Sequence, residues 1–423
     1  MNILMMSNTY TPIAGGLEKS IRTFSTQLRK LGHKVTIVVP EMKEAPKREQ
    51  GVLRIPAIPQ VIGTDFSVNV PVPGQLSKLV DSFKPDLVHA HHPFLVGDLA
   101  LRLCGQYQIP LVYTHHTLFD RYQYDLPLAN GAWKHFLVRL SAGYANLTDR
   151  VIAPSESVRR ILIRRGVRVP IAVVPTGIDT RDFAAGNGRA LRRRLGIPRT
   201  AFVIGYSGRL APEKNLDFLA RSSARFMKKN GNVYFLALGA GPSRKKIHTF
   251  FKKSGIGNRV RFAGVLQGKQ LADGYRAMDL FVFTSKSETQ GLAITEAMAA
   301  GLPVITLDAP GAREIVRDKI NGRLLPAQNE KAFAEALSWF HDLSPAKQKK
   351  IKQAARRSAQ KFSIDLETDR MLRVYHSLRR RKLPSEGLKS TWHKLRRRIR
   401  TEWQMLNNVT KATGAALASI IKL

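Results

Sequence analysis

Two acidic side chains stand eight residues apart in TSKSETQGLAITEAMAAGLPVI, which runs from Thr284 to Ile305. Carboxylates accept paired hydrogen bonds from vicinal hydroxyls, so Glu288 and Glu296 suit the rings of a hexose and a ribose. A helix that begins near Gly291 leaves Glu288 in the preceding loop and places Glu296 in the second turn. The N-terminus of that helix favours an anionic phosphate. In the alternative interpretation, Glu288 complements the helix dipole and Glu296 lies on the helix surface.

Two cations follow an apolar segment in YSGRLAPEKN. Arg209 and Lys214 lie five residues apart, directly after Gly208 and across a turn that contains Pro212. Cations that converge at the end of a strand suit a diphosphate, because they neutralise the charge that grows as a phosphate leaves. The alternative is that both are solvated surface cations.

Five histidines lie at two strand ends in HAHHP and YTHHT. A metal site would need ligands with metal-binding spacing, and no such His, Cys or carboxylate set accompanies them. We interpret His91 as a polar wall of an acceptor pocket, with His115 and His116 beside it. No metal and no cofactor are therefore expected.

A glycine pair, Gly15 and Gly16, stands between the first predicted strand and the first predicted helix. The surrounding NTYTPIAGGLEKS is not G-x-G-x-x-G, so a dinucleotide site is not indicated. A loop that faces a ligand cleft is the alternative to a plain turn. The chain also contains no G-x-S-x-G, P-loop or H-E-x-x-H motif.

The elements that must position these residues alternate between Val/Ile-rich strands and amphipathic helices, as in the helical segment from Leu17 to Leu31. This alternation predicts an α/β fold with buried parallel sheets. It restarts after an Arg-rich, helical break near 186–198, so the chain is interpreted as two Rossmann-like halves. The predicted strands contain NILMMSN, KVTIVVP, PDLVHAHH, PLVYTHH, RVIAPS, IAVVPTG, FVIGYSG, VYFLALG, VRFAGV, LFVFTS and PVITLD.

Ligands of such folds bind at the carboxyl ends of the strands, and two facing sheets would form one cleft between the domains. The predicted organisation is an acceptor-binding domain over 1–185 and a nucleotide-sugar-binding domain over 186–360. A helix at 361–378 returns towards the first domain, and a basic amphipathic tail occupies 379–423.

Length and composition agree with two globular domains, since the chain has 423 residues, of which 43% are hydrophobic. Its one cysteine, Cys104, allows no intrachain disulfide. The start MNILMMSNTY lacks a basic n-region, and no apolar run reaches the ~20 residues that would span a bilayer. A cytoplasmic protein is expected. The net charge of +38 favours polyanionic partners, namely anionic lipid, nucleic acid or a phosphorylated substrate.

Taken together, these motifs resemble the retaining glycosyltransferases of GT-B fold in the large family with the Glu-x7-Glu motif. The resemblance covers Met1 to about Leu378 and includes GRLAPEKN, VIAPSESV, VVPTGID and INGRLL. It implies that Arg209 and Lys214 bind the donor diphosphate and that Glu288 contacts the transferred sugar. Glu296 would then bind the ribose.

The resemblance also implies roles for the backbone and for the acceptor side. Backbone amides around Thr289, Gln290, Gly291 and Leu292 would contact phosphate and sugar, while Gly16 would lie against the donor phosphates. His91 would line the acceptor side near the reacting carbon. Two cations and a helix terminus would replace a metal.

A finer resemblance concerns the acceptor. THHTLFDRYQYDLP and SETQGL are similar to bacterial diacylglycerol glucosyltransferases, which transfer glucose from UDP-glucose to a membrane lipid. In mannosyltransferase relatives a glutamate follows the second histidine, where this chain has His92, which argues against a phosphoinositol acceptor. The same chemistry on a lipopolysaccharide or polysaccharide is the first alternative. A non-catalytic protein that binds anionic lipid through the same fold is the second.

The tail carries ten Lys/Arg and one Glu over residues 379–400. Its apolar residues recur every three or four positions, which predicts a helix with one apolar face and an arginine-rich opposite face. Such a helix suits the surface of an anionic membrane, and packing on the protein itself, a partner helix or nucleic acid are the alternatives. A second basic and aromatic stretch lies at 133–140. The residues expected at the membrane are Trp133, Lys134, Trp392, Arg396, Arg397, Arg398 and Trp403.

Overall fold

The computed structural model describes residues 1–13, 15–42, 44–46, 48–58, 68–69, 73–120, 131–379 and 391–421. These residues form two compact units. The first unit contains residues 1–120, 131–177 and 367–421, and the second contains residues 178–366.

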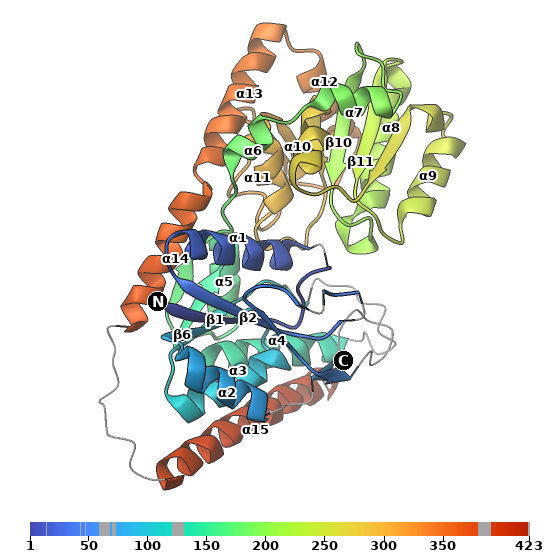
Figure 1. Ribbon diagram of the computed structural model, residues 1–423. Helices are drawn as coiled ribbons and strands as arrows, with labels where there is room; N and C mark the ends of the chain where they lie inside the picture. Colours follow the sequence, from blue (N-terminus) through green and yellow to red (C-terminus); the bar gives the residue numbers. More distant parts are fainter. Residues whose placement is uncertain are drawn as a thin grey trace. The chain divides into compact units, whose positions relative to one another are not determined.

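The first unit is built on a seven-stranded parallel sheet with strand order β3-β2-β1-β6-β7-β8-β9 (Figure 1). Six of its strands occupy the apolar segments predicted from the sequence, whereas β3 was not predicted. A separate antiparallel pair joins β4 (Ala57–Ile58) to β5 (Val68–Asn69). The seven strands are β1 (Asn2–Met6), β2 (Lys34–Pro40), β3 (Val52–Ile55), β6 (Leu87–Ala90), β7 (Leu111–Thr114), β8 (Arg150–Ala153) and β9 (Ile171–Val173).

Helices cover both faces of this sheet because its strands are apolar on both sides. On one face, α1 (Gly16–Lys30) and α14 (Ile364–Arg379) pack on residues such as Ile3 and Met5. On the other face, residues such as Leu4 and Met6 pack against α2, α3 and α4. The remaining helices of this unit are α2 (Pro73–Phe83), α3 (Val96–Tyr107), α4 (Gly131–Asn146), α5 (Glu156–Arg164) and α15 (Thr391–Ile421).

The second unit repeats the architecture with a six-stranded parallel sheet of order β12-β11-β10-β13-β14-β15. The five predicted strands of this half are present, and β15 completes the sheet. Its central strands have almost no exposed surface, and one continuous apolar core surrounds them. The strands are β10 (Phe202–Ser207), β11 (Val233–Leu238), β12 (Val260–Gly264), β13 (Leu280–Phe283), β14 (Val304–Leu307) and β15 (Gly322–Leu325).

The helices of the second unit include α7, which occupies the predicted helical break. The set consists of α6 (Thr180–Ala184), α7 (Gly188–Arg194), α8 (Leu216–Lys229), α9 (Arg244–Lys253), α10 (Gly268–Arg276), α11 (Leu292–Ala299), α12 (Glu330–His341) and α13 (Pro345–Gln360), with short 3-10 helices at Pro212–Lys214 and Gly257–Arg259. The units divide at 177/178 and 366/367, whereas the sequence places the first boundary at 185/186. The segment after Gly177 already belongs to the second unit, because Ile178 N donates to Phe362 O at 3.0 Å.

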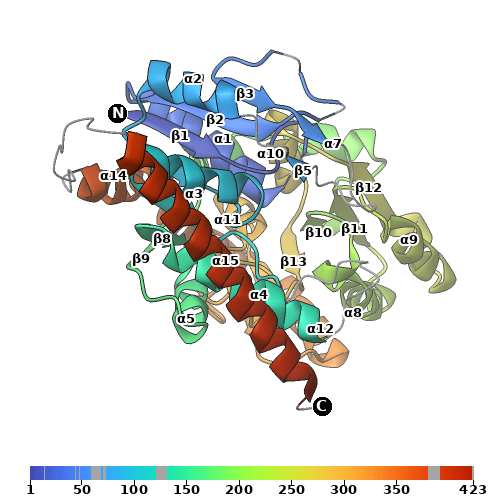
Figure 2. The same cartoon turned by 90° about the horizontal axis from the view of Figure 1, so that it is seen from below.

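The tail forms one long helix, α15, which lies along α3 and α4 of the first unit (Figure 2). Arg102 of α3 makes a bidentate ion pair with Glu402, through Nε at 2.5 Å and Nη2 at 3.1 Å. Asn408 Nδ2 donates to Leu140 O of α4 at 3.1 Å. Met405 contributes to the core on this side of the sheet. Packing on the protein itself, one of the alternatives for the tail, is therefore realised.

Two glycines let α15 approach closely. A Cβ built on Gly105 of α3 would lie 2.3 Å from Thr401 Oγ1, and one on Gly143 of α4 would lie 1.6 Å from Asn408 Oδ1. The face of α15 opposite these contacts is open to solvent, since Trp403 is 66% exposed, and Leu406 at the edge of the packed face is 58% exposed. Among the described residues, no helix is long and apolar enough to cross a membrane.

The close approach at Gly143 predicts a stability effect. Gly143→Ala should displace the Asn408 amide, break its bond to Leu140 O and weaken the docking of α15 by about 1–3 kcal/mol. Hydrogen exchange should become faster over residues 400–416 and stay unchanged in the second unit. Gly131→Ala, on the same helix with no atom within 4 Å of the added Cβ, is the matched control. Equal protection of α15 in the two variants would contradict the prediction.

Candidate functional site

In an open parallel sheet, ligands bind where the strand order reverses, beyond the carboxyl ends of the strands. The first sheet reverses between β1 and β6, and the second between β10 and β13. The Gly15-Gly16 loop follows β1 and the His91 loop follows β6. In the second unit, Arg209 and Lys214 follow β10, while Glu288 follows β13. The topology thus brings the predicted residues together at two sheet edges.

The central contact of the second edge is an ion pair between two predicted residues. Lys214 Nζ lies 2.7 Å from Glu288 Oε1, and the side chains are only 18% and 20% exposed. Burial by itself would raise the pKa of the Glu288 carboxyl, but the charge and hydrogen bond of Lys214, together with a bond from Ser285, hold it below its usual value. Glu288 is thus kept ionised and oriented at the point where the strand order of the second sheet reverses.

Hydrogen bonds join the two loops that carry this pair. Thr284 Oγ1 donates to the carbonyls of Lys214 and Asn215 at 3.3 and 3.1 Å. Asn215 Nδ2 donates in turn to Thr284 O at 3.2 Å, and the backbone of Asn215 lies in the left-handed region, with φ 56°. The position of Lys214 relative to Glu288 is therefore set by backbone contacts as well as by charge.

Arg209 differs from Lys214 in its exposure. Its side chain is 54% exposed, and its Nη1 lies 3.9 Å from Glu213 Oε1, beyond hydrogen-bond distance. Tyr206 donates its hydroxyl to Arg209 O at 3.0 Å and fixes the backbone there. Gly208 has φ +147°, and a Cβ at that position would lie 2.8 Å from the Tyr206 hydroxyl, so a side chain is excluded. The guanidinium is thus held on a defined loop but is accessible.

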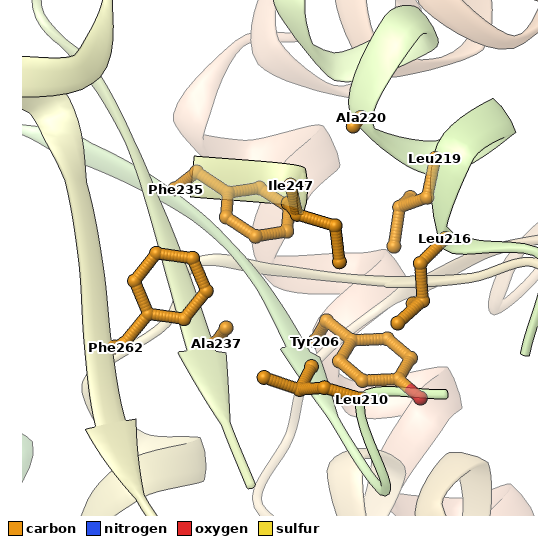
Figure 3. Close-up of a pocket in the computed structure, with 9 residues that line it drawn as sticks. All are labelled: Tyr206, Leu210, Leu216, Leu219, Ala220, Phe235, Ala237, Ile247 and Phe262. Atoms are coloured by element: carbon orange, nitrogen blue, oxygen red, sulfur yellow. The ribbon is translucent and has the colours of Figure 1, made fainter. Parts of the chain in front are cut away.

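An apolar cavity of about 10 Å³ lies near this loop (Figure 3). Its side chains come from the loop after β10, the strands β10–β12, and the helices α8 and α9. The volume suffices for at most one water, so the cavity belongs to the core and is no ligand site. The lining residues are Tyr206, Leu210, Leu216, Leu219, Ala220, Phe235, Ala237, Ile247 and Phe262.

The helix after Glu288 begins one residue later than predicted, at Leu292. Gly291 caps it in the left-handed region, with φ 76°, which an L side chain rarely adopts. Gly311 packs against the preceding peptide, since a Cβ there would lie 2.6 Å from the carbonyl carbon of Gln290. Gln290 is buried and Thr289 half-buried. The first backbone amides of α11 follow directly on this turn.

The second predicted acid, Glu296, lies in the second turn of α11 and is 4% exposed. Tyr275 of α10 donates its hydroxyl to Glu296 Oε2 at 2.7 Å. Burial is the main cause that raises the pKa of Tyr275, and the Glu296 charge adds to it, so the phenol stays protonated as the donor. A buried carboxylate needs such a partner. The alternative interpretation, in which Glu296 lies on the helix surface, is wrong.

In the first unit, Gly15 is the N-cap of α1 and Gly16 its first residue. Thr9 donates its hydroxyl to Glu18 Oε1 at 2.5 Å, which ties the loop after β1 to the first turn of α1. A Cβ at Gly15 would meet Glu18 Oε2 at 2.3 Å, whereas the space at Gly16 is open to 4 Å. Burial raises the pKa of Glu18. The open position is the one predicted to lie against donor phosphates, and that role stays a prediction.

The predicted acceptor histidines form a connected group. His91 Nδ1 lies 3.0 Å from His116 Nε2, and the His91 ring is 4.2 Å from the ring of His89 between centroids. His89 in turn contacts Tyr375 Oη of α14 at 2.7 Å and Thr114 Oγ1 at 2.6 Å. His91 Nε2 is buried without a hydrogen-bond partner among the described residues. The arrangement holds His91 through its neighbours and leaves that nitrogen for a ligand.

His115 is placed differently from the other two. It has no exposed surface, its Nδ1 lies 3.0 Å from the Tyr113 hydroxyl, and its ring packs at 6.2 Å from Phe119. His115 Nε2, like His91 Nε2, is buried without a hydrogen-bond partner among the described residues, and a direct acceptor contact by His115 stays a prediction.

Of the residues predicted at a membrane, Trp133 is 37% exposed at the start of α4 and stacks on Phe136 at 5.2 Å. Lys134 follows it and is half-buried, whereas Trp403 is largely exposed on α15. The backbone of the remaining four belongs to α15, and their side chains lie outside the described residues. Those four are Trp392, Arg396, Arg397 and Arg398.

Four supporting residues were not predicted from the sequence. Tyr275 and Tyr375 are ordinary core aromatics by pattern, and only the fold brings their hydroxyls to Glu296 and His89. Thr284 had a local signal, since a polar residue directly follows the apolar β13. Gly311 had a signal in its sequence, APGA, which indicates a turn. Across the described part of the chain, no group of three or more His, Cys, Asp or Glu side chains could hold a metal ion.

The buried histidines predict how stability depends on pH. Burial lowers the pKa of His89 and His115 to about 3 and of His92 to about 4, and it is the main cause that lowers those of His91 and His116. An unfolded chain takes up these protons near pH 6.5, but the folded chain does not. The free energy of unfolding should therefore fall as the pH drops from about 6.5 towards 4, by about 1.4 kcal/mol per pH unit for each imidazole.

Urea unfolding at pH 7 and pH 5.5 checks this, with His92→Asn as the variant. An asparagine oxygen can accept the bond that His92 Nδ1 now accepts from Asn8 N at 3.1 Å, so the variant should lose one titrating group and show a shallower pH slope. His248→Asn, on the exposed face of α9, is the control. A slope that is the same in wild type and His92→Asn would contradict the assignment.

Comparison with known proteins bears on both units. Residues 14–182 match Glycosyltransferase Family 4, and residues 188–358 match Glycosyl transferases group 1. The chain is similar to an alpha-monoglucosyldiacylglycerol synthase of Streptococcus pneumoniae, with 30% identity over 81% of this chain and 80% of that protein. It is also similar to a GDP-mannose-dependent alpha-mannosyltransferase of Mycobacterium tuberculosis, with 29% identity over 90% of this chain and 98% of the relative.

Solved structures share the fold. HepE of Anabaena in complex with UDP superposes with a TM-score of 0.70 at 23% identity, over 89% of this chain and 100% of that one. Sucrose-phosphate synthase of Thermosynechococcus elongatus reaches a TM-score of 0.74 at 21% identity, over 89% and 99%. With two parallel Rossmann-like sheets and both family matches, the chain belongs to glycosyltransferase family 4, a family of retaining, metal-independent glycosyltransferases of GT-B fold.

Proposed function

We propose that this glycosyltransferase transfers a hexose, glucose, from a UDP-sugar to a membrane lipid such as diacylglycerol. The observation that carries the proposal is the partly buried Lys214–Glu288 pair, which lies where the strand order of the second sheet reverses. An ammonium and a carboxylate in contact there offer a cation to the leaving diphosphate and an acceptor to sugar hydroxyls.

The donor is bound in this proposal by four side chains of the second unit. Arg209 is accessible and supplies a planar guanidinium for a diphosphate. Lys214 has three N–H donors, so it can keep its bond to Glu288 while it donates to phosphate oxygens. Glu296, oriented by Tyr275, retains acceptor capacity for the vicinal hydroxyls of a ribose, because a carboxylate has about four lone-pair sites.

The reaction needs the bond between the anomeric carbon and the phosphate oxygen to break while the acceptor oxygen binds that carbon on the same face. In the proposed course, the acceptor proton passes to the departing phosphate oxygen. Arg209, Lys214 and the amides at the start of α11 stabilise the charge on that oxygen. Glu288 grips ring hydroxyls and is no nucleophile in this scheme. His91, neutral at pH 7, lines the acceptor side as a polar contact.

Two kinds of relative support different donors. The Streptococcus pneumoniae relative is a monoglucosyldiacylglycerol synthase, and another of that name in Acholeplasma laidlawii is 28% identical over 76% of this chain. These names, and the UDP found in the HepE structure, favour UDP-glucose. The mannosyltransferase relatives make GDP-mannose the competing donor. A polysaccharide or lipopolysaccharide acceptor is the competing acceptor.

A lipid acceptor requires access to a membrane, and we place the enzyme in the cytoplasm, peripheral on the inner face. Exposed apolar side chains of α15 support this: Trp403, Leu406 and Val409 are 66%, 58% and 43% exposed. Exposed Arg400 and Lys411 lie on the same helix, and each basic residue near an anionic surface contributes about 1 kcal/mol. Trp133 extends the exposed aromatic surface on α4.

The first prediction from the proposed function tests catalysis. Lys214→Ala should lower kcat by about 10²–10³, because it removes a cation that acts on the charge developing in the transition state. Transfer from radiolabelled UDP-glucose to diacylglycerol measures it, and Lys228→Ala, an exposed lysine on α8, is the control. A non-catalytic lipid-binding protein would show no turnover in wild type, and equal turnover in wild type and Lys214→Ala would reject the proposed role of Lys214.

The second prediction concerns donor binding. Tyr275→Phe should raise the KM for the donor by about tenfold or more, because a hydrogen bond to a charged group is worth about 1.5–3 kcal/mol. It should leave the KM for the lipid unchanged. The same assay with UDP-glucose and GDP-mannose, followed by analysis of the labelled lipid and its linkage, identifies the sugar and acceptor. If the label enters only polysaccharide, the proposal of a lipid acceptor is wrong.

The third prediction concerns the membrane. Removal of the whole tail would uncover α3 and α4, so substitutions on its outer face are the sharper test. Trp403→Ser with Leu406→Ser should reduce sedimentation with anionic vesicles without changing UDP binding. Val265→Ser with Ile320→Ser removes two equally exposed apolar side chains from the second unit and serves as control. Equal vesicle binding by both double variants would contradict a membrane role for α15.

A further inference from the structure

A cavity of about 320 Å³ lies in the first unit between α3, α4 and α15. Its volume is within the range of about 300–1,000 Å³ that is usual for small-molecule sites. α15 provides one wall and lies outside both matched family segments. The lining consists of Pro93, Phe94, Asp98, Leu101, Arg102, Leu140, Tyr144, Leu147, Glu402, Met405, Leu406, Asn408 and Val409.

The polar groups of the lining are engaged with the protein. Tyr144 donates its hydroxyl to Gly97 O at 3.0 Å, and Asn408 donates to Leu140 O. Arg102 and Glu402 pair with each other. Asp98 Oδ2 accepts a hydrogen bond from Leu95 N at 3.2 Å. A polar ligand or a peptide backbone would have to compete for these partners, whereas an apolar chain would not.

The apolar part of the lining continues to the candidate acceptor wall. Pro93 and Phe94 follow directly after His91 and His92 in the chain. The ring of Phe94 lies 5.4 Å from that of Phe119, which packs on His115. One end of the cavity is therefore within a few residues of the loop that we assign to the acceptor head.

The other side of the cavity reaches the surface of α15. Leu406 and Val409 line the cavity and are nevertheless 58% and 43% exposed. On the helix they lie between the packed side, which carries Met405, and Trp403, which is proposed to meet the membrane. A chain leaving a bilayer at this surface would enter between apolar side chains.

We propose that this cavity binds one acyl chain of the lipid acceptor while the hydroxyl to be glycosylated lies at the His91 wall. The assignment rests on the proposed lipid acceptor and deepens it: α15 becomes part of the substrate site. Apolar contact along the chain, rather than hydrogen bonding, then determines the preference for long-chain acceptors.

A blocking variant and its neighbour on the same helix test the assignment. Met405→Trp fills the cavity, whereas Gln404→Trp adds the same side chain on the exposed face. Val409→Trp obstructs the rim from a half-exposed position and needs no rearrangement of the core. The probe is a dioleoylglycerol with a diazirine in one acyl chain, presented to the full-length protein in phosphatidylglycerol vesicles.

Photocrosslinks should map to peptides that contain Leu101, Leu140 or Met405. Their yield should fall by about tenfold in Met405→Trp and Val409→Trp but not in Gln404→Trp, as expected for the loss of about 1.4 kcal/mol of contact. The KM for dioleoylglycerol should rise by a similar factor, with the KM for UDP-glucose and the KM for dihexanoylglycerol unchanged.

The outcomes separate the two proposals. If both blocking variants transfer glucose to dioleoylglycerol with unchanged KM and unchanged crosslinks, the assignment of the cavity to an acyl chain is wrong. The proposed function is then unaffected. Crosslinks confined to the outer face of α15 would lead to the same conclusion. Wild-type enzyme that transfers sugar to no lipid would overturn the proposed function and this assignment together.

Discussion

The partly buried contact between Lys214 and Glu288 is the constraint on which the second unit's site depends. Each of these groups would be costly to hold out of water alone, and breaking such a pair leaves an uncompensated charge. The contact is possible because β10 and β13 are neighbours, although 72 residues lie between Ser207, where β10 ends, and Leu280, where β13 begins. That adjacency is the strand-order reversal itself. The same reversal leaves the loops after both strands on one edge, and the Thr284–Asn215 hydrogen bonds then fix their separation. Topology, loop geometry and charge therefore converge on one point, which is why we assign the leaving group to it.

The sequence allowed most of this site to be predicted, since its signals are local. Strands appear as short Val/Ile-rich runs, and the residues directly after them are at the sheet edge by the geometry of parallel strands. Residues that act across the sheet or from another helix could not be predicted. Tyr275 is one of the buried residues of α10, and only the packed fold brings its hydroxyl to Glu296. The strands β3 and β15 were missed because Val52–Ile55 and Gly322–Leu325 are short and contain an arginine each. The roles of the site residues, and the facing of the two sheet edges, stay predictions.

The histidines of the first unit show how burial limits their chemistry. A metal or a general base would need an imidazole that is accessible or paired with a carboxylate. Here the rings contact one another, Tyr113, Tyr375 and Thr114, and burial keeps them neutral at physiological pH. A neutral imidazole with one unpartnered nitrogen can still accept or donate a hydrogen bond, which suits His91 as a contact for an acceptor hydroxyl. The support runs through His89 to Tyr375, so α14 contributes to the proposed acceptor wall although it follows the second unit in the chain.

The tail joins these arguments, because α15 uses its two faces for different purposes. Glycines at 105 and 143 bring one face close to α3 and α4, where an ion pair and an amide hydrogen bond satisfy its polar groups. A close-packed helix trio would leave no space, yet a cavity remains beside the close contacts, with Met405 and Leu147 in its wall. The cavity lies next to the loop proposed for the acceptor and reaches exposed apolar side chains of α15, while its polar groups are engaged with the protein, so an acyl chain suits it better than a polar ligand.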